Sequence, residues 1–196
     1  SQPKAVIIVV EISNKMGDQF GDYDLNWRNY KDGVLGILST ISDSDYFNVI
    51  KTPETLASNI IALNGTGVMQ MNPLRRLQAK EFIMNDNRPV NDLGRGEWGS
   101  SFITATEMVM EAPVCAGHKQ VVLVILGNSP TSKKKEELGF SATLSSPSHI
   151  MEWLNAYSSD VIIHTMALGM NPQFSEASDG FTEKFFREMS CRTGGI

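Results

Sequence analysis

Short runs of apolar, mostly β-branched residues constrain the fold of this chain more than any other feature. Residues 4–11, 120–126 and 160–168 each form such a run, which is typical of strands buried on both faces of a parallel sheet. Residues 46–52 mix apolar with polar side chains, so we expect a fourth strand that is less buried. These runs predict that strands dominate the core.

Segments with apolar residues three and four positions apart separate the strands and predict helices. The predicted helices cover residues 30–41, 73–84, 101–112, 147–157 and 180–191. Alternation of strands and helices predicts an α/β fold, a doubly wound (Rossmann-like), mostly parallel central sheet with helices on both faces. We expect a single domain over residues 1–196, with surface loops at 85–99 and 128–146.

Composition disfavours two classes of partner. The formal net charge is −5 and no basic stripe is present, which disfavours nucleic acid. No apolar run reaches the roughly 20 residues that span a bilayer, which disfavours direct membrane insertion. The two cysteines, Cys115 and Cys191, could form one disulfide or be buried thiols. Asn64-Gly65-Thr66 is a glycosylation sequon, which matters if the protein is secreted.

Sequence motifs of common enzymes are missing. The first strand is followed by "EISNKMGD" and not by a glycine-rich phosphate turn, and neither a P-loop nor a G-x-S-x-G motif occurs. His164 lies inside a predicted strand, where we expect a structural, hydrogen-bonded histidine, while His118 and His149 are expected at the surface. We therefore expect no enzyme. A perturbed acidic pair at the site would indicate an enzyme instead. Asp18, Asp43 and Asp45 are the candidates, but turn or capping roles explain them more simply.

Four segments at or near the ends of the predicted strands together resemble the motifs of a known family. The sequence reads "EISNK" after the first strand, "TISDSDYFNV" before the second, "GEWGSSFITATEMVMEA" at residues 96–112 and "QVVLVILGNSP" at residues 120–130. Over nearly its whole length the chain resembles von Willebrand factor A (VWA) domains. "TISDSDYFNV" and the cysteine before "QVVLVIL" are most similar to the alpha-2/delta subunits of calcium channels. The resemblance implies a short antiparallel edge strand near residues 60–63 and a final edge strand beyond residue 196.

The resemblance also implies a binding site at the strand ends. VWA domains hold one divalent cation in a metal-ion-dependent adhesion site (MIDAS), where hydroxyl and carboxylate oxygens suit a hard cation. The family's first aspartate corresponds to Glu11, and its two serines correspond to Ser13 and Lys15. The family's loop threonine corresponds to Ser100, and a later aspartate to Gly127.

Two of these replacements oppose metal binding. Lys15 brings an ammonium group that repels a dication, and Gly127 removes a carboxylate. We therefore expect no metal and no other cofactor at this degenerate site. If Mg or Ca were retained, Glu11, Ser13 and Ser100 would hold it. The Lys15 ammonium could occupy the place of the cation and pair with Glu11, or it could point to solvent.

The resemblance implies a non-catalytic adhesion or interaction module of a larger, extracellular or cell-surface protein. Its partner is expected to be another protein or another domain of the same polypeptide. The alternatives are a purely structural VWA domain in a larger assembly, or a VWA domain with non-standard metal binding. A disulfide between Cys115 and Cys191, at the rim opposite the adhesion-like site, would support an oxidising compartment.

Overall fold

The computed structural model describes residues 2–11, 23–52, 60–85, 98–113, 117–125, 160–167 and 183–196. In these ranges the strands are β1 (Lys4–Val10), β2 (Tyr46–Lys51), β3 (Ile61–Ala62), β4 (Met69–Gln70), β5 (His118–Ile125) and β6 (Val161–Ala167). The helices are α2 (Tyr23–Ser39), α3 (Pro73–Met84), α4 (Trp98–Met110) and α6 (Glu183–Thr193). The predicted helix at 147–157 lies outside the described residues.

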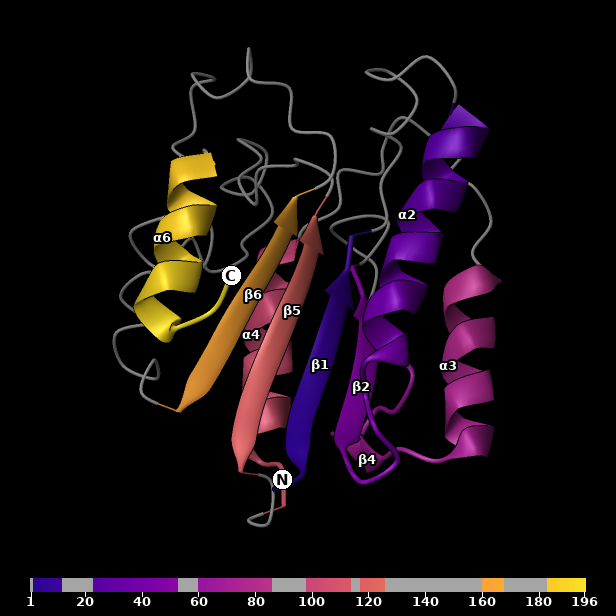
Figure 1. Ribbon diagram of the computed structural model, residues 1–196, viewed down its shortest axis with the longest axis horizontal. Coiled ribbons are helices and arrows are strands. Elements are labelled where there is room, and N and C mark those ends of the chain that lie inside the picture. Colours follow the sequence, from indigo (N-terminus) through magenta and orange to yellow (C-terminus); the bar gives the residue numbers. More distant parts are fainter. Residues whose placement is uncertain are drawn as a thin grey trace, which may run out of the picture.

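A parallel sheet forms the centre of the fold (Figure 1). Its strand order is β3-β2-β1-β5-β6, with β4 also paired to β2. β1 pairs in parallel with β2 and β5, and β5 pairs in parallel with β6. Val10 lies opposite both Lys51 and Val124, so the carboxyl ends of these three strands lie together.

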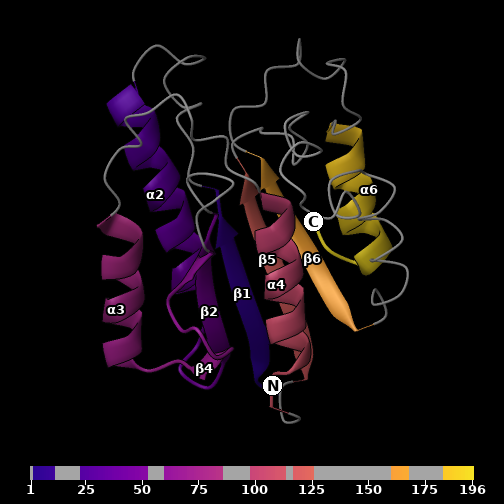
Figure 2. The ribbon, with the colours of Figure 1, turned by 180° about the vertical axis from the view of Figure 1, so that it is seen from behind.

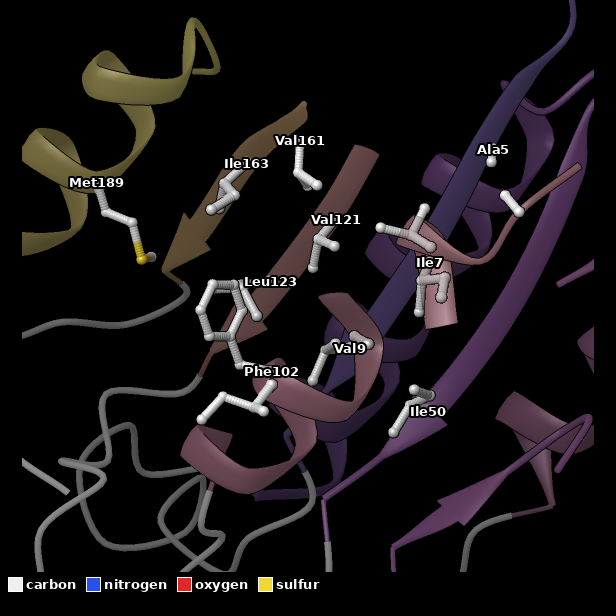
Figure 3. Packing of buried hydrophobic residues seen from close by; sticks show 14 of the residues in the cluster. Ala5, Ile7, Val9, Ile50, Phe102, Val121, Leu123, Val161, Ile163 and Met189 are labelled. Atoms are coloured by element: carbon white, nitrogen blue, oxygen red, sulfur yellow. The ribbon is translucent and has the colours of Figure 1, made fainter. Parts of the chain in front are cut away.

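Alternate residues of β1 enter two different cores. Ala5, Ile7 and Val9 pack in a cluster with residues of α4 and α6. Figure 3 shows Phe102 of α4 and Met189 of α6 pointing toward the sheet in this cluster. The other residues of β1 pack with α2 and α3, and Figure 2 shows α4 on the face opposite to these helices. Helices on both faces confirm the predicted doubly wound architecture.

Helix α3 has the predicted bounds, and polar contacts cap both of its ends. Asn72 accepts a hydrogen bond from the Arg75 N–H at 2.8 Å, and Pro73 opens the first turn. At the other end, the Lys31 ammonium donates to the Met84 carbonyl at 3.0 Å. The Lys51 ammonium donates to the Phe82 carbonyl. The negative end of the helix dipole also attracts cations at these carbonyls.

Two expectations about the first half of the chain are wrong. Helix α2 begins at Tyr23 rather than at residue 30, because Trp27 and Tyr30 both face the core and stack 5.6 Å apart. Strand β2 is as buried as its neighbours, although it contains Asn48 and Lys51. Both polar side chains are buried because each has hydrogen-bond partners.

The predicted antiparallel edge strand is confirmed, and it has a large bulge. β3 and β4 both pair antiparallel with β2, and residues 63–68 loop out between them. The buried Asn48 amide fills this bulge by donating to the Asn64 and Gly67 carbonyls, each at 2.8 Å. Its oxygen accepts from the Asn64 N–H at 3.1 Å. Gly67 has φ of 120°, a conformation that favours glycine.

The last residues turn back onto β6. Gly194 has φ of 76° and ends α6 with hydrogen bonds from its own N–H to Cys191 and from Gly195 to Ser190, a Schellman motif. The Thr165 N–H then donates to the Ile196 carbonyl at 2.8 Å. His164 accepts from the Ile196 N–H at Nδ1, at 3.3 Å, which confirms its structural role.

Candidate functional site

The candidate site lies at the rim formed by the carboxyl ends of β1, β2 and β5 and by the first turn of α4, residues 98–101. Helix α4 precedes β5 and runs antiparallel to it, so its N-terminus lies beside the carboxyl ends of the strands (Figure 2). Ligands of open α/β sheets bind at this edge. We refer to it below as the rim.

Glu11 is held in place at the rim by main-chain hydrogen bonds. Its N–H donates to the Val124 carbonyl at 3.0 Å, which extends the β1–β5 ladder by one bond. Its carbonyl accepts from the Tyr30 hydroxyl at 2.8 Å, and that hydroxyl also reaches the Val124 carbonyl at 3.1 Å. Glu11 is fully buried. Side-chain alternation along β1 places it on the face covered by α4.

The structure brings two of the five predicted site positions to this rim. Glu11 follows β1, and Ser100 lies in the first turn of α4. Gly127 lies outside the described residues, but β5 ends at the same rim two residues before it. Ser13 and Lys15 also lie outside the described residues. The predicted convergence of the strand ends is therefore confirmed where the chain is described, and the roles of the individual side chains stay predictions.

The expectation that the rim holds no divalent cation rests on the sequence and stays a prediction. Hard cations require several oxygen ligands, and Mg²⁺ demands near-octahedral geometry. At the positions that match the family's site, the sequence supplies an ammonium at Lys15 and no side chain at Gly127. Glu11 is also one methylene longer than the aspartate it replaces. Within the described ranges, no group of three His, Cys, Asp or Glu residues could hold a metal ion.

Lys51 is a rim residue that the sequence reasoning missed. It lies in register with Val10 at the end of β2 and is 7% exposed. Its ammonium lies 3.8 Å from the centroid of the Phe82 ring, within cation–π range. The signal was present, because Phe47, Val49 and Lys51 alternate along β2 and the first two face the core. This alternation places a positive charge beside the strand that carries Glu11.

Two buried polar atoms near the rim have no hydrogen-bond partner among the described residues. They are the indole Nε1 of Trp27 and the hydroxyl of Ser101. Trp27 lies in the N-terminal part of α2 and Ser101 in the first turn of α4, on opposite faces of the sheet. Unpartnered buried groups of this kind are costly and call for an explanation, of which a functional role is one.

The other candidate residues lie away from the rim. Cys191 is exposed on α6, so the alternative of a buried thiol is wrong for this residue. The reason is that α6 turns Met189 and Ser190 toward the core and leaves Cys191 on its outer side. Cys115 lies outside the described residues, and its pairing with Cys191 stays a prediction.

Asp45 has a structural role in the turn before β2. Its carboxylate accepts from the Lys4 N–H at 3.0 Å and from the Ser42 N–H at 2.8 Å. Burial raises the pKa of Asp45, but these hydrogen bonds and the charge of Lys4 outweigh burial, and the pKa lies below its usual value. This arrangement agrees with the expected turn role.

Among the described residues, no helix is both long and apolar enough to cross a bilayer.

Comparison with known proteins identifies the fold. No protein-family model and no curated protein matches the chain. Among solved structures, von Willebrand factor type A from Catenulispora acidiphila is 15% identical with a TM-score of 0.54, covering 99% of this chain and 43% of that one. The pilus adhesin SpaC from Lactobacillus rhamnosus GG is 12% identical with a TM-score of 0.61, covering 98% and 27%.

A third similar structure has a metal-bound site. Proximal thread matrix protein 1 from the mussel byssus, solved with a zinc-occupied MIDAS motif, is 15% identical with a TM-score of 0.56, covering 98% of this chain and 46% of that one. The chain thus spans less than half the length of these relatives. At such identities the likeness shows the fold. The chain has the VWA fold, as the sequence predicts.

Proposed function

We propose that this chain is a non-catalytic protein-interaction module that uses the rim without a bound metal ion. The observation that carries the proposal is the placement of Glu11, which is fully buried at the carboxyl end of β1, beside β5 and on the face covered by α4. VWA domains use this edge of the sheet for their adhesion site. The pilus adhesin SpaC, which has the same fold, is an adhesive protein by its name.

Electrostatics supports an interaction that needs no metal. Relative to the family pattern, Lys15 adds a positive charge and Gly127 removes a negative one, a change of about two charge units. Unit charges 4 Å apart interact by about 4 kcal/mol at an effective dielectric of 20, and a dication doubles this repulsion. An ammonium paired with Glu11 would supply the positive charge that a cation supplies elsewhere in the family.

The partner proposed here is another protein or another domain of the same polypeptide. The likeness to SpaC supports an extracellular or cell-surface setting. The "TISDSDYFNV" segment supports a narrower kinship with the alpha-2/delta subunits of calcium channels.

The second candidate is a VWA domain that retains non-standard metal binding. The burial of Glu11 at the rim favours it, because carboxylate oxygens are ligands that hard cations prefer. In this case Glu11, Ser13 and Ser100 would be the ligands, and the zinc-occupied site of the mussel protein shows that this fold can hold ions other than Mg²⁺.

The experiment that tests the proposal compares two charge reversals in binding to a partner purified with the native protein. Lys15→Glu should weaken binding at least tenfold, because it removes the cation substitute at the rim. Lys80→Glu, on the exposed side of α3, is the matched control and should leave binding unchanged. Binding should also survive EDTA. Equal effects of the two reversals, or loss of binding in EDTA, would contradict the proposal.

A further inference from the structure

The glycosylation sequon lies in the bulge between β3 and β4, and its outer residues are open to solvent. Gly65 and Thr66 are exposed, and Asn64 is half-buried. A Cβ added at Gly65 would meet no atom within 4 Å, so the space around this turn is open. The Thr66 hydroxyl donates to Oδ1 of Asn64 at 3.0 Å. The asparagine amide and the threonine hydroxyl of the sequon are therefore adjacent in the folded chain.

The folded bulge is compatible with a substituted amide at Asn64. Its Nδ2 donates one hydrogen bond, to the Gly67 carbonyl at 3.1 Å. A glycosylated side chain is a secondary amide and keeps one N–H, which can preserve this bond. The main chain of Asn64 is held independently by the amide of Asn48. Modification of the side chain therefore leaves the contacts that define the bulge in place.

The bulge also lies on a part of the sheet that needs protection. β3 is the last strand in the order of the described sheet, so its outer side is an edge. Ile61 on this strand is 50% exposed. Exposed edge strands with apolar side chains are templates for pairing between molecules, and proteins commonly cover or interrupt them. The bulge interrupts this edge, and a bulky group at Asn64 would cover it.

We propose that Asn64 carries an N-linked glycan that covers the β3–β4 edge of the sheet. The inference rests on the extracellular setting of the proposed function. In the reaction, Nδ2 of Asn64 bonds to the anomeric carbon of a lipid-pyrophosphate-linked oligosaccharide and loses a proton. The lipid pyrophosphate leaves with the electron pair of the broken glycosidic bond. Because β2 lies between this edge and β1, the glycan leaves the rim at Glu11 open.

The test sends the full chain through the secretory pathway of eukaryotic cells behind a cleavable signal. We expect a discrete mass increase that peptide N-glycosidase removes, with Asn64 converted to aspartate. Thr66→Ala should abolish this mass increase, whereas Thr66→Ser, which keeps the hydroxyl, should retain it. A folded, secreted chain without the increase would overturn the inference. Because the signal imposes the route, that result would leave rim binding, measured separately, unaffected.

The same pair of variants tests whether the glycan protects the edge. In sedimentation experiments at rising concentration, the unglycosylated Thr66→Ala protein should self-associate more than glycosylated Thr66→Ser. Treating the Thr66→Ser protein with peptide N-glycosidase should bring its association to the level of Thr66→Ala. Equal association of the glycosylated and unglycosylated proteins would overturn the protective role.

Discussion

The hydroxyl of Tyr30 lies 2.8 Å from the main-chain oxygen of Glu11 and donates a hydrogen bond to it across the rim. The same hydroxyl reaches the Val124 carbonyl at 3.1 Å. One side chain of α2 thereby joins the ends of β1 and β5, two neighbouring strands of the rim. The position of Glu11 depends on a residue 19 positions away along the chain.

Removing this hydroxyl should destabilise the fold. Tyr30→Phe leaves two buried carbonyls without this donor, and we expect a loss of about 1–3 kcal/mol in the free energy of unfolding. Urea denaturation measures the loss. Ser39→Ala is the control, because it removes an exposed hydroxyl that donates to the Gly36 carbonyl. Equal stabilities of the two variants would show that the Tyr30 hydrogen bonds do not stabilise the rim.

Asn48 should be the side chain on which the edge-strand bulge depends. Asn48→Ala leaves the Asn64 N–H and the Gly67 carbonyl without their buried partner, and we expect a loss of about 2–4 kcal/mol. Hydrogen exchange gives the local measurement, since the Asn64 amide should exchange much faster in the variant. An unchanged exchange rate at Asn64 would contradict this role.

The lowered pKa of Asp45 makes stability depend on acid pH. Its hydrogen bonds to Lys4 and Ser42 stabilise the ionised form in the folded chain, so its contribution is present above the unfolded pKa near 3.8. This contribution disappears as pH falls through the lower folded pKa. Denaturant titrations between pH 2 and about pH 6 should therefore show a steeper acid loss in the natural chain than in Asp45→Asn. Parallel curves would contradict this assignment.

The lowered pKa of His164 should cause a second loss of stability on acidification, at higher pH than that of Asp45. Burial and the charge of Lys4 lower the pKa of His164, so the unfolded chain takes up a proton near its usual pKa of 6.5 before the folded chain does. Stability should therefore fall as pH decreases through about 6.5. Protonation of Nδ1 would also remove the acceptor for the Ile196 N–H. His164→Gln should flatten the curve in this interval, and an unchanged slope would contradict the prediction.

Local sequence patterns predicted the fold well, because a strand or helix shows which of its faces is buried through the spacing of its own apolar residues. The apolar runs of β1 and β5 mark strands with helices on both sides, and both strands have neighbours on both edges. Asn72 and Pro73 mark the start of α3 at the position where the structure has it. In each of these cases the chemistry that fixes the element lies within a few residues of it.

Features that depend on distant partners could not be predicted in this way. From the sequence, Asn48 is expected to be an exposed polar residue. In the structure it is buried because the turn at Asn64, 16 residues later, supplies its hydrogen-bond partners. Tyr30 reaches Val124 across 94 residues. For the site itself, the resemblance placed Glu11 and Ser100 at one rim correctly, because strand ends and helix starts follow from topology. Ser13, Lys15 and Gly127 lie outside the described residues, so their roles stay predictions.

The most direct test of the central claim is the melting temperature of the chain in divalent cations and in EDTA. Linkage makes the test sensitive, because a ligand at 100 times its dissociation constant stabilises the folded state by about 2.7 kcal/mol. We predict equal melting temperatures in EDTA and in millimolar Mg²⁺, Ca²⁺, Mn²⁺ or Zn²⁺. The variant Glu11→Asp, Lys15→Ser, Gly127→Asp should gain a cation-dependent rise, which shows that the assay detects binding. A cation-dependent rise in the natural chain, lost on Ser13→Ala, would contradict a metal-independent rim.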